Sequence, residues 1–386
     1  MSSLNELPFF WKGGKTPLCN YDNRGQEKLQ VLDDFYTSSK NGERKARPWR
    51  AKKMQNELLA IAYDEVDEAK ASRLRACATV LSFKEFSDGT KKLDSMNSCR
   101  VRLCPICSWR RSLKNFYNNL RVAQWLEDNE PGEWLHLTLT VRNCEGDELG
   151  DTIDKMMYAF NKFTKNVNVK KVVRGYYRGL EVTHDVNEFI TRESYERRKK
   201  YLKAQGLKVG DKNPTFDLYH PHFHVLLNVS KSYFKSRDYM SLEAWGEAWR
   251  QALSVDYMPS IKVQRLRAYG KSAVNSSEGE SSERSALLGA VAEVSKYATK
   301  SGDYIYPDDW DLTVSAVRIL DAALSSRRLI AYGGNCLKAQ RALKLDDADN
   351  GDLVNVGDEL DNKDLPYEIV SYAWNTGYKQ YGKVKN

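Results

Sequence analysis

The feature that most constrains how this chain can fold is a short run near its middle, residues 219–227, with the sequence YHPHFHVLL. The chain has five histidines, and three of them stand in this run at a spacing of two residues, which is the side-chain period along one face of a β-strand. A strand here would direct His220, His222 and His224 to one face and leave Phe223 and Val225 on an apolar face that packs against helices. Neutral imidazole is the commonest protein ligand for divalent transition metals, so the run predicts a metal site. An ordinary strand with histidines on its surface is the alternative.

Length and composition indicate a globular protein with two domains, or one domain with large additions. The 386 residues exceed what a single core usually holds. Hydrophobic residues make up 41% and charged residues 29% of the chain, a balance that excludes a mostly disordered protein. The sequence has no apolar run of about 18 residues and no secretory signal at its start. We therefore expect a soluble, cytoplasmic protein without a membrane partner.

Charge is unevenly distributed along the chain. The formal net charge is +8, but residues 346–364 hold eight acids and one lysine, a local charge of −7, so the remainder carries +15. A body this basic favours a polyanionic partner, most simply nucleic acid. The acidic segment is either a plain linker or a decoy that competes with DNA for the basic groove.

Four cysteines predict a second metal site. Cys99, Cys104 and Cys107 follow one another closely in a Cys-x4-Cys-Pro-Ile-Cys pattern, and Cys77 lies 22 residues before the first of them. Four thiolates are the number that a closed tetrahedral zinc site takes, and disulfides are not expected in the cytoplasm. Such a site would be structural, because four sulfurs leave no open position for a substrate. Cys77 could instead be a small buried hydrophobe.

Helices are predicted on both sides of this cysteine cluster. Residues 54–74 show one apolar face, and residues 109–127 follow the last cysteine with a helical pattern. The second helix would present Arg110, Arg111 and Lys114 to DNA phosphates.

Three further strands are expected around the histidine run. Residues 134–141 alternate polar and apolar side chains, and residues 172–183 and 261–266 are rich in β-formers. The second of these strands places Glu181 between apolar neighbours, where a carboxylate usually has a partner such as a metal. A glutamate exposed at a sheet edge is the alternative. Residues 192–204 and 233–253 are predicted helices, and the polar stretches 184–217 and 270–285 have no assigned role.

Residues 286–300 are predicted to form a helix with an unusual polar set. Glu293 and Tyr297 are four residues apart and would share one face, with Lys296 and Lys300 beside them. Tyrosine is a possible nucleophile when a neighbouring group activates it. An ordinary amphipathic helix explains the same spacing.

In their order along the chain, these motifs resemble the rolling-circle replication initiators of small bacterial plasmids, which are HUH endonucleases with one catalytic tyrosine. The matching motifs are the Leu137–Thr140 strand, the pair His222 and His224, and Tyr297-x-x-Lys300 preceded by Glu293. The Cys-Pro-x-Cys segment, residues 180–183 and residues 328–334 are also similar to family features. The resemblance covers residues 50–345.

The resemblance implies sequence-specific nicking and joining of one DNA strand at a plasmid origin. Tyr297 would form a covalent 5′-phosphotyrosine link, and Glu293 would serve the closing step. A divalent metal, Mn²⁺ or Mg²⁺, on His222, His224 and either Glu181 or His220 would polarise the phosphate. Lys296 and Lys300 would favour the phenolate. The implied partners are double- and single-stranded origin DNA, a host helicase and a host DNA polymerase.

We therefore predict an α+β fold in which the histidine strand is central to an antiparallel sheet of the HUH type, related to ferredoxin-like and RRM-like folds. Helices would cover its apolar face, and Tyr297 would lie on a helix at its imidazole face. The expected divisions are an irregular segment 1–48, a helical zinc-stapled region 49–128, an endonuclease domain 129–345, and an acidic linker with a C-terminal tail 346–386. A relaxase or transposase, or a non-catalytic origin-binding regulator, is the alternative function.

Overall fold

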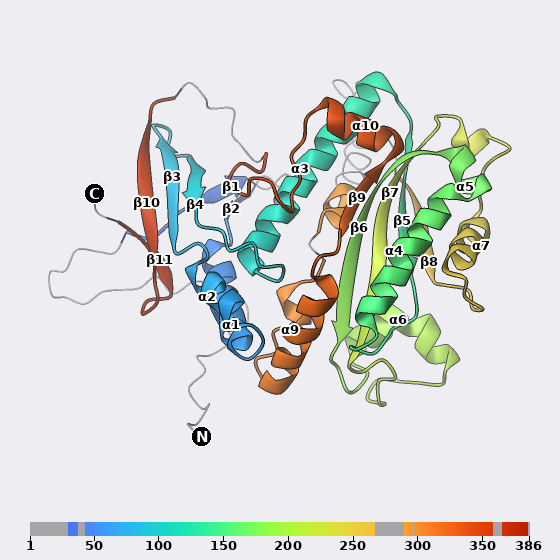
Figure 1. The fold of residues 1–386 in the computed structure, drawn as a ribbon, viewed down its shortest axis with the longest axis horizontal. Helices are drawn as coiled ribbons and strands as arrows, with labels where there is room; N and C mark the ends of the chain where they lie inside the picture. Colours follow the sequence, from blue (N-terminus) through green and yellow to red (C-terminus); the bar gives the residue numbers. More distant parts are fainter. Residues whose placement is uncertain (1–29, 38–42, 267–288, 297, 358–364, 385–386) are drawn as a thin grey trace.

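Within the described residues, the two larger of three antiparallel sheets have helices α3 (Pro105–Asn129), α9 (Trp310–Leu324) and α10 (Gly334–Ala342) between them (Figure 1). The computed structural model describes residues 30–37, 43–266, 289–296, 298–357 and 365–384. A mixed architecture of antiparallel sheets and helices was predicted, and this arrangement confirms it. Within the described residues, no helix is both long enough and apolar enough to cross a membrane.

The larger sheet has five strands and is antiparallel throughout. Across the sheet, the strands are β8 (Ile261–Leu266), β5 (Glu133–Thr140), β7 (Leu218–Val229), β6 (Val173–Asp185) and β9 (Ile330–Gly333). The histidine strand, β7, is therefore central, as predicted. The register sets Glu181 of β6 opposite His222, and Thr138 of β5 opposite His224.

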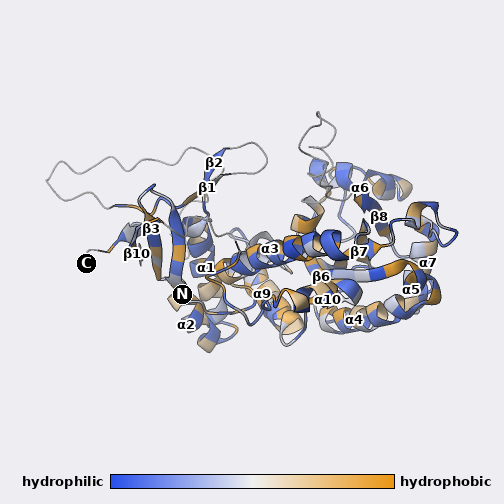
Figure 2. Cartoon of the chain, turned by 90° about the horizontal axis from the view of Figure 1, so that it is seen from above, coloured by the Kyte–Doolittle hydropathy of each residue, from blue (hydrophilic) through white to orange (hydrophobic). Residues whose placement is uncertain are grey.

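One face of this sheet is apolar and packs against helices. Phe223 on β7 contacts the ring of Phe160, with the ring centroids 5.6 Å apart. The covering helices are α4 (Leu149–Lys165), α5 (Val167–Val172) and α7 (Leu242–Leu253). Figure 2 shows hydrophilic and hydrophobic residues alternating along α4, as expected for a helix with one buried face.

The opposite face carries the histidines and is covered by other elements. Over one part of it, an apolar cluster joins Leu226 of β7 to Val122 of α3 (Pro105–Asn129) and to Val291. Val291 belongs to a helix over residues 289–294, and α10 (Gly334–Ala342) packs in the same cluster. The polar part of this face is left for the candidate site.

The smaller sheet is built from both ends of the chain. Its order is β11 (Gln380–Lys383), β10 (Tyr367–Asn375), β3 (Val80–Phe86) and β4 (Lys91–Met96). Two predictions are corrected here. Region 49–128 is not only helical, because it contains β3 and β4. Residues after 346 are not only a linker and tail, because β10 pairs with β3 over seven residue pairs.

Helices next to the smaller sheet also differ from the predicted ones. The helix expected at 54–74 is two helices, α1 (Trp49–Asp64) and α2 (Glu68–Ala76), because Asp67 caps the second through the backbone N–H of Lys70. Asp321 of α9 (Trp310–Leu324) accepts hydrogen bonds from Tyr63 of α1 and Lys70 of α2 (both 2.6 Å), so α9 contacts both helices.

The remaining elements are short or peripheral. The predicted helix 233–253 is divided into a 3₁₀ turn η1 (Tyr233–Lys235) and α7, whereas α6 (Arg192–Ala204) has its predicted bounds. The other elements are β1 (Phe35–Thr37), β2 (Arg44–Ala46) and the 3₁₀ turn η2 (Ser301–Asp303).

Candidate active site

Three predicted ligands come together on the polar face of the five-stranded sheet. Glu181, His222 and His224 each offer one ligand atom, and these atoms all lie within 4.8 Å of one another. Glu181 Oε2 is 3.0 Å from His224 Nε2 and 3.7 Å from His222 Nε2. All three side chains are largely buried, since β6 and β7 are inner strands of the sheet.

The hydrogen bonds around the two imidazoles suit a metal site. His222 Nδ1 lies 3.1 Å from the carbonyl oxygen of His220, and His224 Nδ1 lies 3.3 Å from His136 Nε2. In the tautomer that places each proton on Nδ1, both Nδ1 atoms can donate to these neighbours, and the Nε2 atoms beside Glu181 can then bind a metal. Two imidazoles and one carboxylate, with positions left open, are a donor set that divalent metals use in catalytic sites.

His220 does not belong to this group of ligand atoms. Its ring stacks on the ring of His222, with centroids 4.9 Å apart and an interplanar angle of 23°. Of the two candidates for the third ligand, the geometry therefore favours Glu181.

Charged residues from the segment between β8 and β9 lie beside this group. Lys300 Nζ lies 3.0 Å from Glu181 Oε1, and Glu293 Oε1 lies 3.7 Å from His224 Nε2. Lys296 forms an ion pair with Glu293. Burial alone would raise the pKa of Glu181, but hydrogen bonds with the two imidazoles and the charge of Lys300 outweigh it and lower that pKa. Glu181 is therefore an ionised carboxylate, the form that binds a metal.

The predicted helix 286–300 ends early. Tyr297 lies outside the described residues, but the residues on both sides of it are described. The helix over 289–294 stops at Val294, and the backbone carbonyl of Ala298 accepts a hydrogen bond from Val182 N–H of β6 (2.6 Å). The prediction of a continuous helix through this segment is therefore wrong, because the edge of β6 binds its backbone instead.

A glycine allows this close approach. A Cβ atom at Gly179 of β6 would stand 2.7 Å from the carbonyl oxygen of Val294, closer than real contacts allow. Asn119 of α3 also donates a hydrogen bond to Ser295 (2.9 Å). Contacts with α3 therefore fix the residues before position 297, and a hydrogen bond with β6 fixes the residue after it.

The four predicted cysteine ligands also come together. Their Sγ atoms all lie within 4.8 Å of one another, and three of the separations are 3.7, 3.7 and 3.8 Å. Four sulfurs bound to one tetrahedral zinc ion stand about 3.8 Å apart, so the spacing fits zinc. Backbone N–H groups and the amide of Asn56 point at the sulfurs, as at structural zinc sites. The four residues are Cys77, Cys99, Cys104 and Cys107.

Two of the predicted DNA contacts are corrected. The Arg110 guanidinium is 1% exposed and donates hydrogen bonds to the carbonyl oxygens of Leu353 and Val354 (2.9 and 2.6 Å). Lys114 is also buried and binds Asp346 (2.8 Å). These cations fix the C-terminal acidic segment to α3 and do not face open solvent.

His136 is a site residue that the sequence reasoning missed. It lies on β5 beside His224, and the two rings stack with centroids 5.5 Å apart. Because side chains alternate along a strand, His136 lies on the same face as Thr138 and Thr140. The signal that the sequence lacked is the pairing of this strand with the histidine run.

Comparison with known proteins gives one consistent result. A family model described as Replication protein matches residues 90–382. A protein named Protein rep from Bacillus amyloliquefaciens is 36% identical over 369 residues, which is 92% of this chain and 98% of the relative. A Protein rep from Lactiplantibacillus plantarum is 35% identical over 353 residues, covering 90% of this chain and 98% of the relative. A Protein rep from Streptococcus pneumoniae is 31% identical over 353 residues, 90% of this chain and 95% of the relative.

No solved structure matches. The chain belongs to the Replication protein family, the plasmid replication initiators that its motifs resemble.

Proposed function

We propose that this protein starts rolling-circle replication by nicking and rejoining one DNA strand at the plasmid origin, as an HUH-type endonuclease with Tyr297 as nucleophile. The observation that carries the proposal is the group formed by Glu181, His222 and His224, to which Lys300 and Glu293 add their charges. The family assignment supports a replication initiator.

The chemistry is a transesterification at a phosphodiester. The Tyr297 oxygen attacks the phosphorus, loses its proton and forms a 5′-phosphotyrosine bond, while the 3′ oxygen of the neighbouring nucleotide leaves and takes up a proton. A divalent metal held by Glu181, His222 and His224 would polarise the scissile phosphate. Mn²⁺ and Mg²⁺ are the candidates. The released 3′-OH is the end that a host polymerase would extend while a host helicase unwinds the duplex.

The neighbouring charged residues have distinct proposed roles. Lys300, with its ammonium 3.0 Å from Glu181, would hold the carboxylate in place and favour the tyrosine phenolate. Glu293 lies 3.7 Å from His224 and would act as a base for the closing step, which frees the enzyme. It also forms an ion pair with Lys296.

The cysteine cluster is proposed to hold a structural Zn²⁺. Its sulfurs are buried and offer no open position, so it would fix α3 to the smaller sheet. Leu103, next to the cluster, accepts a hydrogen bond from Tyr304 (2.6 Å), which links it to the segment that follows position 297.

The metal ligands can be tested by nicking of supercoiled plasmid that carries the origin. Glu181→Gln keeps the size of the side chain but loses its charge, and it should reduce Mn²⁺-dependent nicking by more than about 100-fold. His220→Gln, a neighbour outside the ligand group, should stay within about threefold of the wild type. Equal losses in the two variants would count against the three-residue site, and nicking by the wild type without any divalent metal would count against metal dependence.

A further inference from the structure

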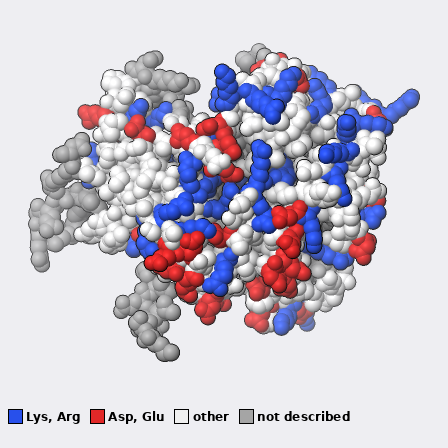
Figure 3. Space-filling view, in the orientation of Figure 1, with Lys and Arg blue, Asp and Glu red and all other residues white. Residues whose placement is uncertain are grey.

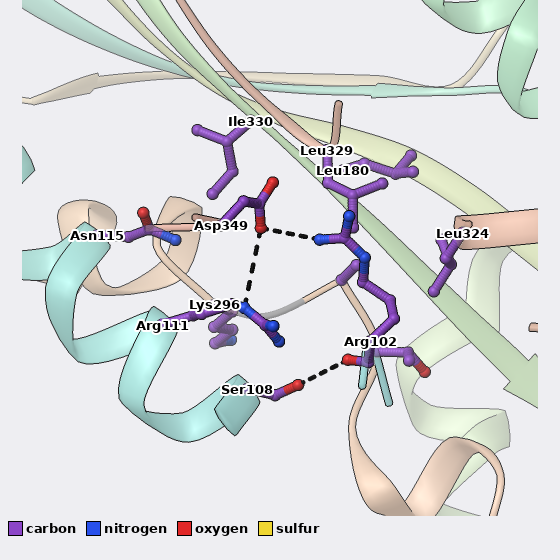
Figure 4. Close-up of a pocket in the computed structure, with 12 residues that line it drawn as sticks. Arg102, Ser108, Arg111, Asn115, Leu180, Lys296, Leu324, Leu329, Ile330 and Asp349 are labelled. Carbon is purple, nitrogen blue, oxygen red and sulfur yellow. Dashed lines mark hydrogen bonds and ion pairs between the residues drawn. The ribbon is translucent and has the colours of Figure 1, made fainter. Parts of the chain in front are cut away.

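A pocket lies beside the segment that carries Tyr297, between that segment and α3. Its cavity volume is about 30 Å³, and Lys296, Ala298 and Thr299 of the tyrosine segment line it. Arg102 and Arg111 also line the pocket, with Lys296 beside Arg111 and with apolar side chains such as Leu180, so cations lie next to the proposed nicking site (Figure 4).

Arg111 is buried with unused donors. It is 7% exposed, and its Nη2 donates a hydrogen bond to the carbonyl oxygen of Arg100 (3.0 Å). Its Nε and Nη1 atoms are buried, and they have no hydrogen-bond partner among the residues that the structure describes. Leaving a buried charged donor unpaired is costly, so the arrangement is one that an additional anion would complete.

The carboxylate of Asp349 lies near Arg111 but does not accept hydrogen bonds from its free donors. Asp349 Oδ1 lies 2.8 Å from Arg102 Nη1 but 4.0 Å from Arg111 Nε, which is beyond hydrogen-bond distance. Figure 4 shows Asp349 between the two guanidinium groups. A phosphodiester offers such a pair two non-bridging oxygens that share one negative charge, and guanidinium groups bind phosphate with parallel hydrogen bonds.

Asp349 belongs to the acidic segment, which is held on α3 by several hydrogen bonds and by the buried side chain of Leu353. Asp346 binds Lys114, and the carbonyl oxygens of Leu353 and Val354 bind Arg110. Figure 3 shows Lys and Arg side chains across the middle of this face, with an acidic group beside them. The acidic segment therefore brings a negative charge to the cationic pocket in the protein without DNA.

We propose that Arg102 and Arg111 form a subsite for a backbone phosphate of single-stranded DNA next to the nicking position, and that Asp349 occupies this subsite until DNA displaces it. The identity of the ligand rests on the proposed function, since the pocket adjoins the tyrosine segment. The acidic segment thus competes with DNA through one defined carboxylate.

The test is DNA binding without cleavage. Fluorescence anisotropy with a labelled 30-nucleotide oligo-dT is measured in a Tyr297→Phe background, without added Mn²⁺ or Mg²⁺, across a range of salt concentrations. Asp349→Asn should tighten binding by about three- to tenfold and steepen the dependence of log K on log salt by about 0.7, the value for one more phosphate contact. Asp256→Asn is the control, because it makes the same charge change at an exposed position outside this pocket.

A double variant separates the subsite from a general change in charge. Asp349→Asn combined with Arg102→Gln removes both members of the ion pair. This double variant should bind oligo-dT no more tightly than the Tyr297→Phe background protein. The proposal is overturned if Asp349→Asn and Asp256→Asn bind oligo-dT with the same affinity, or if the double variant binds as tightly as Asp349→Asn. If inorganic phosphate raises the Tm of Asp349→Asn while its oligo-dT affinity equals that of the control, the pocket binds free phosphate and the DNA assignment is wrong. Because no cleavage is measured, a failure of the nicking proposal would leave this result unaffected.

Discussion

At the scale of single residues, His224 has hydrogen-bond partners at both ring nitrogens. Its Nε2 faces Glu181 at 3.0 Å, and its Nδ1 faces His136 Nε2 at 3.3 Å. Burial lowers the pKa of His136 to about 4, so its ring is neutral at physiological pH and can accept the proton on His224 Nδ1. Under the proposed function, His136 would therefore be a positioning residue that fixes which nitrogen of His224 faces a bound metal.

Replacing His136 should weaken metal binding without removing a ligand. His136→Leu loses the acceptor, and the affinity for Mn²⁺ measured by isothermal titration calorimetry should fall by about 10- to 100-fold. His136→Gln keeps an acceptor oxygen and should restore much of the affinity. Wild-type Mn²⁺ affinity in His136→Leu would show that the contact does not position His224.

The ligand set shows what the sequence predicts well and what it does not. The period of two placed His222 and His224 on one face, and the structure brings them within reach of Glu181 as expected for neighbouring strands. The choice between Glu181 and His220 depended on which strand pairs with β7 and in what register. That information is not contained in either strand alone.

At the scale of elements, α3 connects the two ends of the molecule. Cys104 caps its first turn and Cys107 lies within it, while Asn119 farther along contacts the segment before position 297. A zinc ion at the cysteines would thus fix the helix that supports the candidate active site.

Loss of one cysteine should therefore affect both metal content and stability. Cys107→Ser should lower the zinc content from about one ion per chain to near zero, measured by inductively coupled plasma mass spectrometry, and should lower the Tm by about 5 °C or more. Cys144→Ser changes a buried cysteine outside the cluster and should keep its zinc. Full zinc occupancy in Cys107→Ser would contradict the four-cysteine site.

Elements with a strong local pattern were predicted closely, whereas tertiary contacts changed the others. The strand at 261–266 and the helix at 192–204 have their predicted bounds. The helix predicted over 286–300 stops at Val294, because Val182 at the edge of β6 takes the carbonyl of Ala298. A helical pattern alone does not reveal a competing partner in the sheet.

At the scale of the whole molecule, the C-terminus completes the N-terminal sheet. The hydroxyls of Ser82 and Ser371 lie 2.9 Å apart although 289 positions separate them in sequence. Tyr381 on β11 is fully buried and donates a hydrogen bond to the carbonyl oxygen of Ala78 (2.7 Å). Pairing over such a distance cannot be read from local patterns, which is why residues after 346 were predicted to be a linker and tail.

The buried tyrosine of β11 provides a test of this pairing. Tyr381→Ala should lower the free energy of unfolding by about 3 kcal/mol in urea denaturation, because it leaves a cavity and an unpaired carbonyl. Tyr378→Ala, at a position that is 69% exposed, should change it by less than about 0.5 kcal/mol. Similar small effects in both variants would mean that the C-terminal strands do not contribute to this core.

The central claim concerns Tyr297, and covalent capture of DNA tests it most directly. A fluorescent single-stranded origin oligonucleotide is incubated with the protein and Mn²⁺, and adducts that survive denaturing electrophoresis are counted. The wild type and Tyr239→Phe, which alters an exposed tyrosine of the same domain, should form the adduct, whereas Tyr297→Phe should form none. An adduct at the wild-type level in Tyr297→Phe would contradict the account.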